Sequence, residues 1–180
     1  MNNEYKIIGL LGRSRVGKDT VANYLCEKYL SYENVKLSLP LKKAVCELYG
    51  FTMDKLETSS KDEIDNRWNK TPRETIQSLT KYMMEYMGID FFTRRLYNMY
   101  DNGMLSNNII ITDIRYNHDI QEIKRRGGLV IKIERPNNSI HNSVENNIDD
   151  LKGDITIYND GTLEELYEKI NQSLNSIVIA

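Results

Sequence analysis

The sequence predicts an α/β fold in which helices cover both faces of a mostly parallel sheet. Short runs of apolar, β-branched residues alternate with longer segments of helical periodicity along most of the chain. Two predicted helices begin with a capping box, and others end at a glycine. A polar loop containing glycines joins the first apolar run to the first helix, as expected of a parallel strand–helix unit.

The first third of the chain is predicted to form strand, helix, strand and helix. Residues 5–11 are an apolar run that reads as the first strand. The helix after it places four apolar side chains on one side: Val21, Ala22, Leu25 and Tyr29. A second strand is expected over 35–38 and a helix over 41–49, with Pro40 separating them. Residues 51–70 are polar and charged, and no element is predicted there.

A well-marked helix start lies at Thr71. Its hydroxyl can cap the helix, Pro72 suits the first helical position, and Glu74 completes a capping box. The apolar stripe of this helix consists of Ile76, Leu79, Met83 and Met87. Gly88 is expected to end it, and Asp90 to cap a further helix.

The last part of the chain predicts another strand–helix–strand unit. Its strands are expected over 108–112 and 129–133, where β-branched residues are dense. Residues 136–153 are rich in Asn and Asp with few apolar anchors, so they are interpreted as an excursion from the core, either a mobile lid or an inert loop. A final strand over 155–158 precedes a helix whose capping box begins at Thr162.

Length and charge narrow the classes of function. The 180 residues fit a single domain that can bury its own core. The net charge of −2, with both signs mixed along the chain, leaves no basic stripe, so polymeric DNA or RNA is not an expected partner. No stretch reaches membrane-spanning length and no signal peptide is indicated, so a cytoplasmic location is expected. Cys26 and Cys46 lack metal or redox spacing and are expected to be reduced thiols.

The strongest functional signal is a Gly-x4-Gly-Lys loop between the first strand and the first helix. It consists of Gly12, Arg13, Ser14, Arg15, Val16, Gly17 and Lys18, followed by Asp19 and Thr20. Such a loop turns backbone amides around phosphate oxygens, the helix N-terminus adds partial positive charge, and the lysine reaches the outer phosphates. Asp19 stands where Ser or Thr usually helps to hold Mg²⁺. We interpret Asp19 as the metal-side residue and Thr20 as a phosphate or helix-start contact.

Other residues are candidates for the metal and for a phosphorylated acceptor. Asp113 follows a buried run, so its carboxylate should emerge at the carboxyl end of a strand beside the phosphate-binding loop, where it suits Mg²⁺ or its water shell. Arg115 lies two residues further on. Arg73 lies in the helix capped by Thr71, with Gln77 one turn later. The two arginines are candidates for gripping an acceptor phosphate with two hydrogen bonds each.

Neither histidine indicates a catalytic base. His118 and His141 lack the partners of a triad or metal site, so both are interpreted as surface or packing residues. Phosphoryl transfer to a phosphate accounts for a site without a base. A phosphate monoester has a second pKa near ~6, so its oxygen is already ionised at neutral pH.

These residues resemble the phage and viral deoxynucleoside monophosphate kinases of the P-loop kinase superfamily. The resemblance covers most of the chain and rests on an ordered set of motifs. The set comprises Gly17-Lys18-Asp19-Thr20-Val21-Ala22, Pro40-Leu41-Lys42, Trp68 before Thr71-Pro72-Arg73-Glu74, Gln77, Thr112-Asp113-Ile114-Arg115, Gly127-Gly128, Glu134-Arg135-Pro136 and the stretch from Asn159 to Leu166.

The resemblance implies a three-layer P-loop kinase fold, in which a five-stranded parallel sheet has the strand order 2-3-1-4-5. It implies an acceptor-binding segment over about 38–90 and a lid over 135–153. It also implies ATP and Mg²⁺ as cofactors, and it makes a homodimer an expectation. For a viral protein the location would be the host cytoplasm.

The resemblance assigns roles by matching motifs. The implied catalytic residues are Lys18, Asp113, Arg115 and Arg135. The implied acceptor site consists of Ser38, Lys42, Trp68, Arg73, Gln77, Asp113 and Arg115. Arg135 would clamp the phosphates of ATP, and the turn containing Asn159 and Gly161 would lie near adenine. Asp113 would lie at the metal or at the acceptor, so that, with Asp19 as interpreted above, Asp19 and Asp113 are the candidate metal residues.

Some positions depart from the family's pattern. Arg13, Arg15 and Val16 replace small residues common in the loop, Leu39 stands where Asp often precedes Pro, and His118 replaces a common acidic residue. These departures bear on the identity of the acceptor more than on phosphate transfer.

Three functions therefore stand as hypotheses. The leading one is ATP-dependent phosphorylation of a deoxynucleoside monophosphate such as dGMP, dTMP or dCMP. The second is a P-loop kinase for another phosphorylated small molecule, similar to the phosphomevalonate and dephospho-coenzyme A kinases. The third is a regulatory module that binds ATP without transferring phosphate, which Asp19 in place of Ser or Thr would favour.

Overall fold

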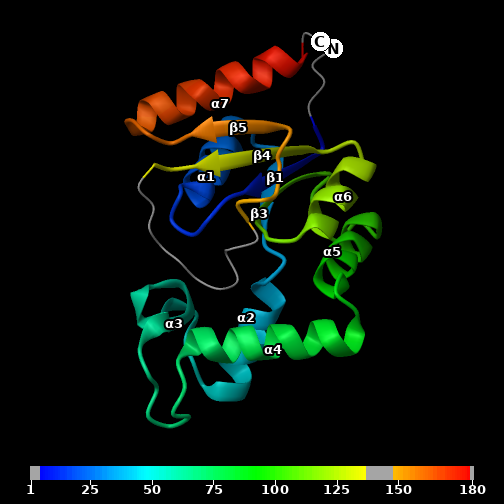
Figure 1. The fold of residues 1–180 in the computed structure, drawn as a ribbon. Coiled ribbons are helices and arrows are strands. Elements are labelled where there is room, and N and C mark those ends of the chain that lie inside the picture. The colour runs from blue at the N-terminus through cyan, green and yellow to red at the C-terminus, as the bar shows by residue number, and fades with distance from the viewer. Residues whose placement is uncertain (1–4, 137–147, 179–180) are drawn as a thin grey trace. The chain divides into compact units, whose positions relative to one another are not determined.

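The computed structural model describes residues 5–136 and 148–178 (Figure 1). In chain order the elements are β1 (Ile7–Leu11), α1 (Lys18–Lys28), β2 (Tyr32–Val35), α2 (Leu39–Tyr49), α3 (Met53–Glu57), the 3-10 helix η1 (Ser59–Asp62), α4 (Pro72–Met87), α5 (Phe91–Asp101), β3 (Asn108–Ile114), α6 (Asn117–Arg125), β4 (Leu129–Glu134), β5 (Ile155–Tyr158) and α7 (Leu163–Val178).

The chain divides into two compact units. The first comprises residues 1–36 and 97–180 and holds the whole sheet, and the second comprises residues 37–96. The bounds of the second unit are close to those of the segment predicted to bind the acceptor, 38–90. The single domain expected over 1–180 stays a prediction.

The first unit is built on a five-stranded sheet in the order β2-β3-β1-β4-β5, which confirms the predicted order. Every neighbouring pair of strands is parallel, as in the pairing of Ile8 with both Ile110 and Leu129. Because the strands are parallel, their carboxyl ends lie at one edge of the sheet, where the loops that follow β1, β3 and β4 meet.

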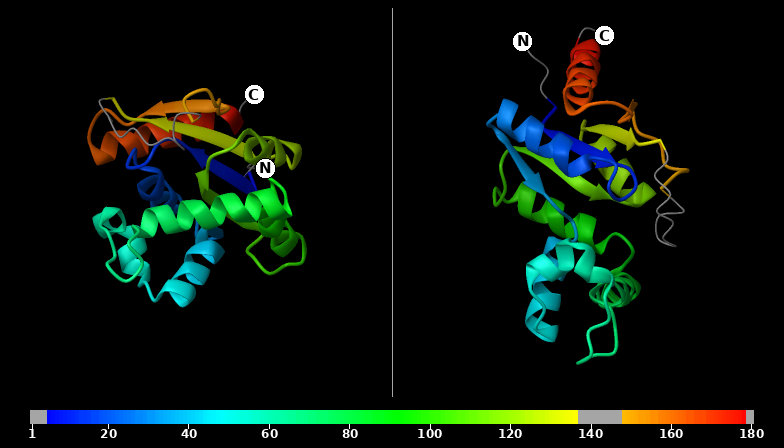
Figure 2. Two further views of the ribbon diagram at one scale, coloured as in Figure 1. Left: turned by 60° about the horizontal axis from the view of Figure 1, so that its bottom comes forward. Right: turned by 90° about the vertical axis from the view of Figure 1, so that its left-hand side faces the viewer.

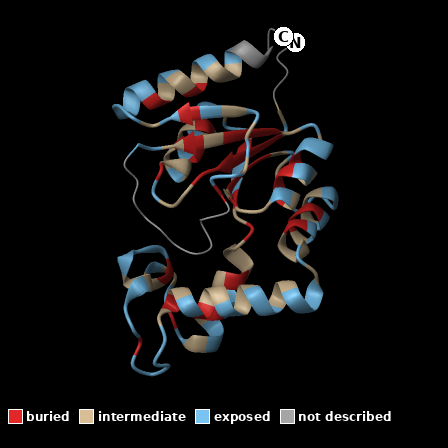
Figure 3. Cartoon of the chain, viewed as in Figure 1, coloured by how far each residue is buried: buried red, intermediate tan, exposed pale blue. Residues whose placement is uncertain are grey.

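Successive residues of β1 face opposite sides of the sheet, and both sides are covered by helices. Ile8 and Leu10 are buried in a cluster with residues of α1 and α7. Gly9 faces the other side, where a Cβ atom would lie 2.7 Å from Cδ1 of Ile123 in α6. Figure 2 shows these helices on the two sides of the sheet, and Figure 3 shows that the strands between them are largely buried. The first unit therefore has three layers.

The second unit has a small core of its own. Val45, Phe51 and Leu56 are buried together, and Ile76 and Leu79 of α4 pack against them. The capping box predicted for α4 is present: Thr71 N–H donates to Glu74 Oε2 at 2.8 Å, and Thr71 Oγ1 accepts from Glu74 N–H at 3.1 Å.

The prediction for β2 was wrong in position. The strand spans Tyr32–Val35, and residue 38 is already the N-cap of α2. Only the two end residues of this edge strand are buried. Its middle residues, Glu33 and Asn34, are exposed and polar, so the strand has no apolar run by which it could be recognised. Pro40 lies in the first turn of α2, where its missing N–H costs nothing.

The polar segment 51–70 contains α3 and η1, which the sequence reading missed. Both are a single turn or little more. Thr52 caps α3 by accepting from Lys55 N–H at 3.2 Å. Elements this short carry too few residues to show a helical period.

Cys26 and Cys46 are free thiols. Across residues 5–136 and 148–178, none of the helices combines the length and the apolar character needed to cross a membrane.

Candidate active site

The phosphate-binding loop leaves β1 and leads directly into α1. Gly12 and Gly17 have φ angles of 149° and 108°, and Arg15 has a φ of 63°. A Cβ atom on Gly12 would lie 2.4 Å from the carbonyl oxygen of Ile133, so no side chain fits there. Gly17 is the N-cap of α1 and no side chain caps the helix. The N-terminus of α1 therefore adjoins the loop, where its partial positive charge suits an anion.

The side chain of Lys18 is enclosed by the loop. Its Nζ donates to the carbonyl oxygens of Gly12 at 2.8 Å and Arg13 at 2.6 Å. These bonds hold the ammonium group at the mouth of the loop, where it can meet the outer phosphates of a nucleotide.

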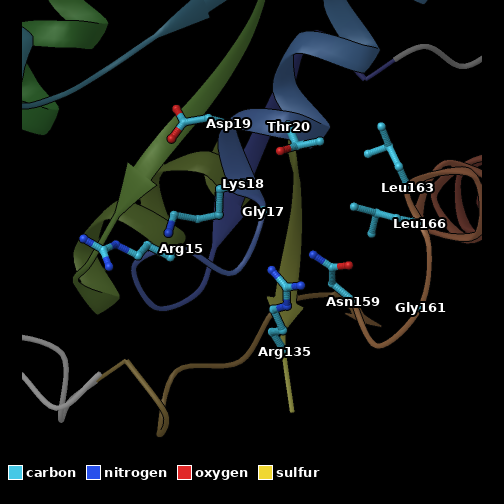
Figure 4. A pocket seen from close by; sticks show the side chains of 10 residues that line it. All are labelled: Arg15, Gly17, Lys18, Asp19, Thr20, Arg135, Asn159, Gly161, Leu163 and Leu166. Carbon is cyan, nitrogen blue, oxygen red and sulfur yellow. The ribbon is translucent and has the colours of Figure 1, made fainter. Parts of the chain in front are cut away.

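A cavity of about 360 Å³ lies beside this loop (Figure 4). Its lining residues are Arg15, Gly17, Lys18, Asp19, Thr20, Arg135, Asn159, Gly161, Leu163 and Leu166. Three cationic residues, Arg15, Lys18 and Arg135, are therefore among those that line the cavity, and their charges favour a polyphosphate there. Leu163 and Leu166, at the start of α7, supply an apolar wall on the side away from the cations.

Eight of the twelve residues predicted to bind ATP line this cavity. The other four, Gly12, Arg13, Ser14 and Val16, belong to the loop but are not among the lining residues. Arg13 forms an ion pair with Asp149, and Val16 is buried with 2% exposed. The sequence reading missed Leu163 and Leu166 as lining residues because the period of α7 marks both as core positions. Leu163 is nevertheless 46% exposed.

Asp19 lies in the first turn of α1 with its side chain 67% exposed, and its carboxylate forms an ion pair with Lys36 at 2.9 Å. Mg²⁺ in kinase sites commonly binds one or two carboxylates together with substrate phosphates and water. Among the described residues there is no cluster of three or more His, Cys, Asp or Glu side chains that could hold a metal alone. A carboxylate beside a phosphate-binding cavity fits a Mg²⁺ ion that shares its ligands with the nucleotide.

Asp113 and Arg115 lie at the carboxyl end of β3, beside the loop. Ile114 pairs with Leu11, the last residue of β1 before the phosphate-binding loop. The structure thus brings these two predicted residues to the same sheet edge as the cavity.

A buried carboxylate fixes the chain just after β3. Asp119 is 3% exposed and its Oδ2 accepts from the backbone N–H groups of Arg115 at 3.2 Å and Tyr116 at 3.1 Å. The histidine beside it packs against neighbours. His118 Nε2 lies 3.3 Å from Asp119 Oδ1, and the imidazole ring stacks on the ring of Tyr116, with 5.2 Å between ring centroids. His118 is thus a packing residue, as predicted, whereas His141 lies outside the described residues. Burial raises the pKa of the Tyr116 hydroxyl above its ordinary value.

The remaining predicted residues belong to the second unit. Arg73 Nε and Nη2 both donate to the carboxylate of Asp62, and Lys42 pairs with Glu57 at 2.7 Å. Trp68 Nε1 donates to the carbonyl of Tyr49 at 2.9 Å. Ser38 is the N-cap of α2, and Gln77 is half-buried on α4.

Comparison with known proteins decides the family. Residues 55–170 match the sequence model described as "Deoxynucleotide monophosphate kinase". A protein of Acanthamoeba polyphaga mimivirus, provisionally described as a deoxynucleotide monophosphate kinase, is 32% identical over 182 residues, which cover 91% of this chain and 93% of the relative. This chain belongs to the deoxynucleotide monophosphate kinase family. As a member of that family it is a nucleotide kinase, a phosphotransferase that uses ATP with a metal ion.

Solved structures confirm the predicted P-loop kinase fold. Shikimate kinase from Aquifex aeolicus has a TM-score of 0.53 at 16% identity, covering 94% of this chain and 96% of that one. TT1252 from Thermus thermophilus has a TM-score of 0.50 at 15% identity, covering 97% and 98%. At these identities the likeness shows the fold alone.

Proposed function

We propose that this kinase transfers the γ-phosphate of ATP, bound with Mg²⁺, to a deoxynucleoside monophosphate such as dGMP, dTMP or dCMP. The observation that carries the proposal is the cavity beside the phosphate-binding loop, which is lined by three cationic residues, Arg15, Lys18 and Arg135. The family supplies the class of acceptor.

The reaction needs alignment and charge neutralisation more than proton transfer. An oxygen of the acceptor's phosphate attacks the γ-phosphorus, a new P–O bond forms, and the bond from the γ-phosphorus to the bridging oxygen breaks, so that ADP and a deoxynucleoside diphosphate result. The attacking oxygen is already ionised, because the second pKa of a phosphate monoester is near ~6. This matches a site in which His118 is committed to packing.

On the donor side, cations would meet the charge that develops on the transferred group. The ammonium of Lys18 would stabilise the transferred phosphoryl group, and Arg135 would clamp the ATP phosphates. Asp19 and Asp113 would hold Mg²⁺ or its water shell. The metal would neutralise the phosphates and help to align them when bound.

On the acceptor side, arginines would grip the phosphate of the deoxynucleotide. Arg73 already binds the Asp62 carboxylate through Nε and Nη2, and this fork geometry suits phosphate oxygens equally well. Arg115 would contribute from the end of β3. Ser38, Lys42 and Gln77 complete the proposed acceptor set.

Trp68 is proposed to stack on the acceptor's base. Its side chain is exposed enough for stacking, with 44% of the residue accessible, although its indole N–H is committed to Tyr49. Stacking predicts that deoxynucleoside monophosphates quench Trp68 fluorescence, which is readily assigned because the chain has one tryptophan. Phosphomevalonate should leave the fluorescence unchanged.

A panel of acceptors tests the proposal. Each nucleoside and deoxynucleoside monophosphate is supplied at millimolar concentration with ATP and Mg²⁺, and ADP release is followed with a coupled assay. Turnover with at least one deoxynucleoside monophosphate is expected. Turnover only with phosphomevalonate or dephospho-coenzyme A would move the function to another kinase class. The homodimer and the cytoplasmic location remain predictions, the first of them open to sedimentation analysis.

A further inference from the structure

Asn159 connects the end of the sheet to the phosphate-binding loop. It follows β5, and its backbone N–H donates to the carbonyl of Glu134 at the end of β4, at 2.7 Å. Its side-chain Nδ2 donates to the carbonyl of Val16 within the loop, at 2.9 Å. Asn159 also lines the cavity (Figure 4).

The hydrogen bond to Val16 fixes which way the amide points. A backbone carbonyl can only accept, so the nitrogen of the amide must face Val16 and the oxygen must face away. The amide also packs closely on Gly17, where a Cβ atom would lie 2.7 Å from Nδ2. Oδ1 is therefore held as an acceptor, and it accepts no hydrogen bond from any residue of 5–136 or 148–178.

The turn that carries Asn159 is supported from both ends. Lys169 Nζ donates to the carbonyl of Tyr158 at 3.0 Å and also binds the carboxylate of Asp160. Beyond the turn, Thr162 N–H donates to Glu165 Oε2 at 2.8 Å as part of the capping box of α7. These contacts hold the turn in place, and with it the side chain of Asn159.

The cavity has two chemically distinct ends. The side chains of Arg15, Lys18 and Arg135 suit phosphates, whereas Leu163 and Leu166 form an apolar wall that suits the flat face of a base. We propose that Asn159 Oδ1 accepts a hydrogen bond from the exocyclic amine of the donor base, and so selects adenine over purines that carry a carbonyl at that position. This inference rests on the proposed use of ATP as the phosphate donor.

The discrimination follows from hydrogen-bond chemistry. Adenine presents an amine donor at position 6, whereas guanine presents a carbonyl acceptor there. Hypoxanthine likewise carries a carbonyl. With either of the latter bases, two oxygens would face each other. One such hydrogen bond contributes about 1 kcal/mol, which corresponds to a preference of roughly 5-fold.

Calorimetric titration with ADP and with inosine diphosphate, without acceptor, tests this inference. The wild type should bind ADP roughly 5-fold more tightly than inosine diphosphate. Asn159→Ala should bind both more weakly and bring the two affinities within about 2-fold of each other. If Asn159 had only a structural role, Asn159→Ala would weaken the binding of both ligands equally and leave the ratio of their affinities unchanged. That result would overturn the inference.

Two further variants complete the test. Asn159→Asp keeps an acceptor oxygen, so it should retain a preference for ADP even with weaker binding overall. Asn102→Ala removes an amide that donates to the carbonyl of Asn98 at 2.7 Å, away from the cavity, and should leave the ratio at its wild-type value. Equal wild-type affinities for the two ligands would overturn the inference alone. Failure of the wild type to bind ADP at all would instead contradict the proposed donor.

Discussion

Arg13 and Asp149 form a bidentate ion pair that joins the phosphate-binding loop to the chain just before β5. Arg13 Nε donates to Asp149 Oδ1 at 2.9 Å, and Nη2 donates to the other carboxylate oxygen. Lys132 Nζ donates to the carbonyl of Asp149 at 3.0 Å. The side chain of Arg13 is thus directed to Asp149, whereas Arg15 lines the cavity.

The Arg13–Asp149 pair should contribute measurably to stability. In a double-mutant cycle of Arg13→Gln and Asp149→Asn, a coupling of about 0.5–1 kcal/mol is expected, because Asp149 is partly exposed. The coupling should shrink in about 1 M salt. Urea denaturation measures it. The exposed pair Lys81–Glu85, at 3.8 Å, is the matched control and should couple more weakly. Strictly additive effects of the two changes on the free energy of unfolding would show that the pair contributes no coupling energy.

Lys18→Ala should lower kcat/KM by on the order of 10², equivalent to about 2.7 kcal/mol of transition-state stabilisation, because the ammonium at the mouth of the loop is lost. Steady-state kinetics with ATP and a competent acceptor measure the change. Lys28→Ala, in the last turn of the same helix, should be close to wild type. Wild-type kinetics for Lys18→Ala would contradict its role.

Arg73→Ala should also lower kcat/KM by on the order of 10² if its guanidinium holds the acceptor phosphate. The loss should depend on the acceptor concentration, whereas the affinity for ATP should not change. Arg94→Ala is the matched control, since Arg94 also forms an ion pair with an aspartate, Asp90, at 3.0 Å. Equal effects of the two arginine changes would mean that Arg73 acts only through stability.

The capping box of α4 should be detectable in unfolding experiments. Thr71→Ala removes the acceptor of the Glu74 N–H and should destabilise the protein by ~1 kcal/mol. Ser78→Ala, at an exposed position in the middle of α4, should be neutral or slightly stabilising because alanine has the higher helix propensity. An unchanged melting temperature in Thr71→Ala would argue that the cap contributes nothing.

Acid should destabilise the protein partly through Glu122. Hydrogen bonds from Arg125, and then from Arg126, lower its pKa to about 2. Since the pKa is below its unfolded value near ~4.3, the stabilisation is present above that value and is lost as the pH falls towards 2. Glu122→Gln should therefore lose less unfolding free energy than the wild type between pH 5.5 and pH 3. Parallel losses in the two proteins would refute this assignment.

The sheet could be predicted because its signals are local. The dense β-branched runs before Asp113 and after Gly128 mark β3 and β4, and both capping boxes can be recognised within four residues. The edge strand β2 carries no such signal, since only its ends are buried. Its place is set by pairing with β3, which a local pattern does not encode.

The residues of the site, too, could be predicted only where their signal is local in the sequence. The phosphate-binding loop is a contiguous motif, so its lysine could be identified directly. The contacts that orient the loop could not, because the partners of Arg13 and Val16 lie 136 and 143 positions away in the chain. Such pairs depend on the packed sheet, which brings β1, β4 and β5 side by side.

Transfer of label from [γ-³²P]ATP tests the central claim most directly. Incubated with Mg²⁺ and a deoxynucleoside monophosphate, the wild-type protein should place the label in the β-phosphate of the deoxynucleoside diphosphate, and Lys18→Ala should do so far more slowly. Label appearing only as inorganic phosphate, or on no deoxynucleotide of the complete set, would contradict the account.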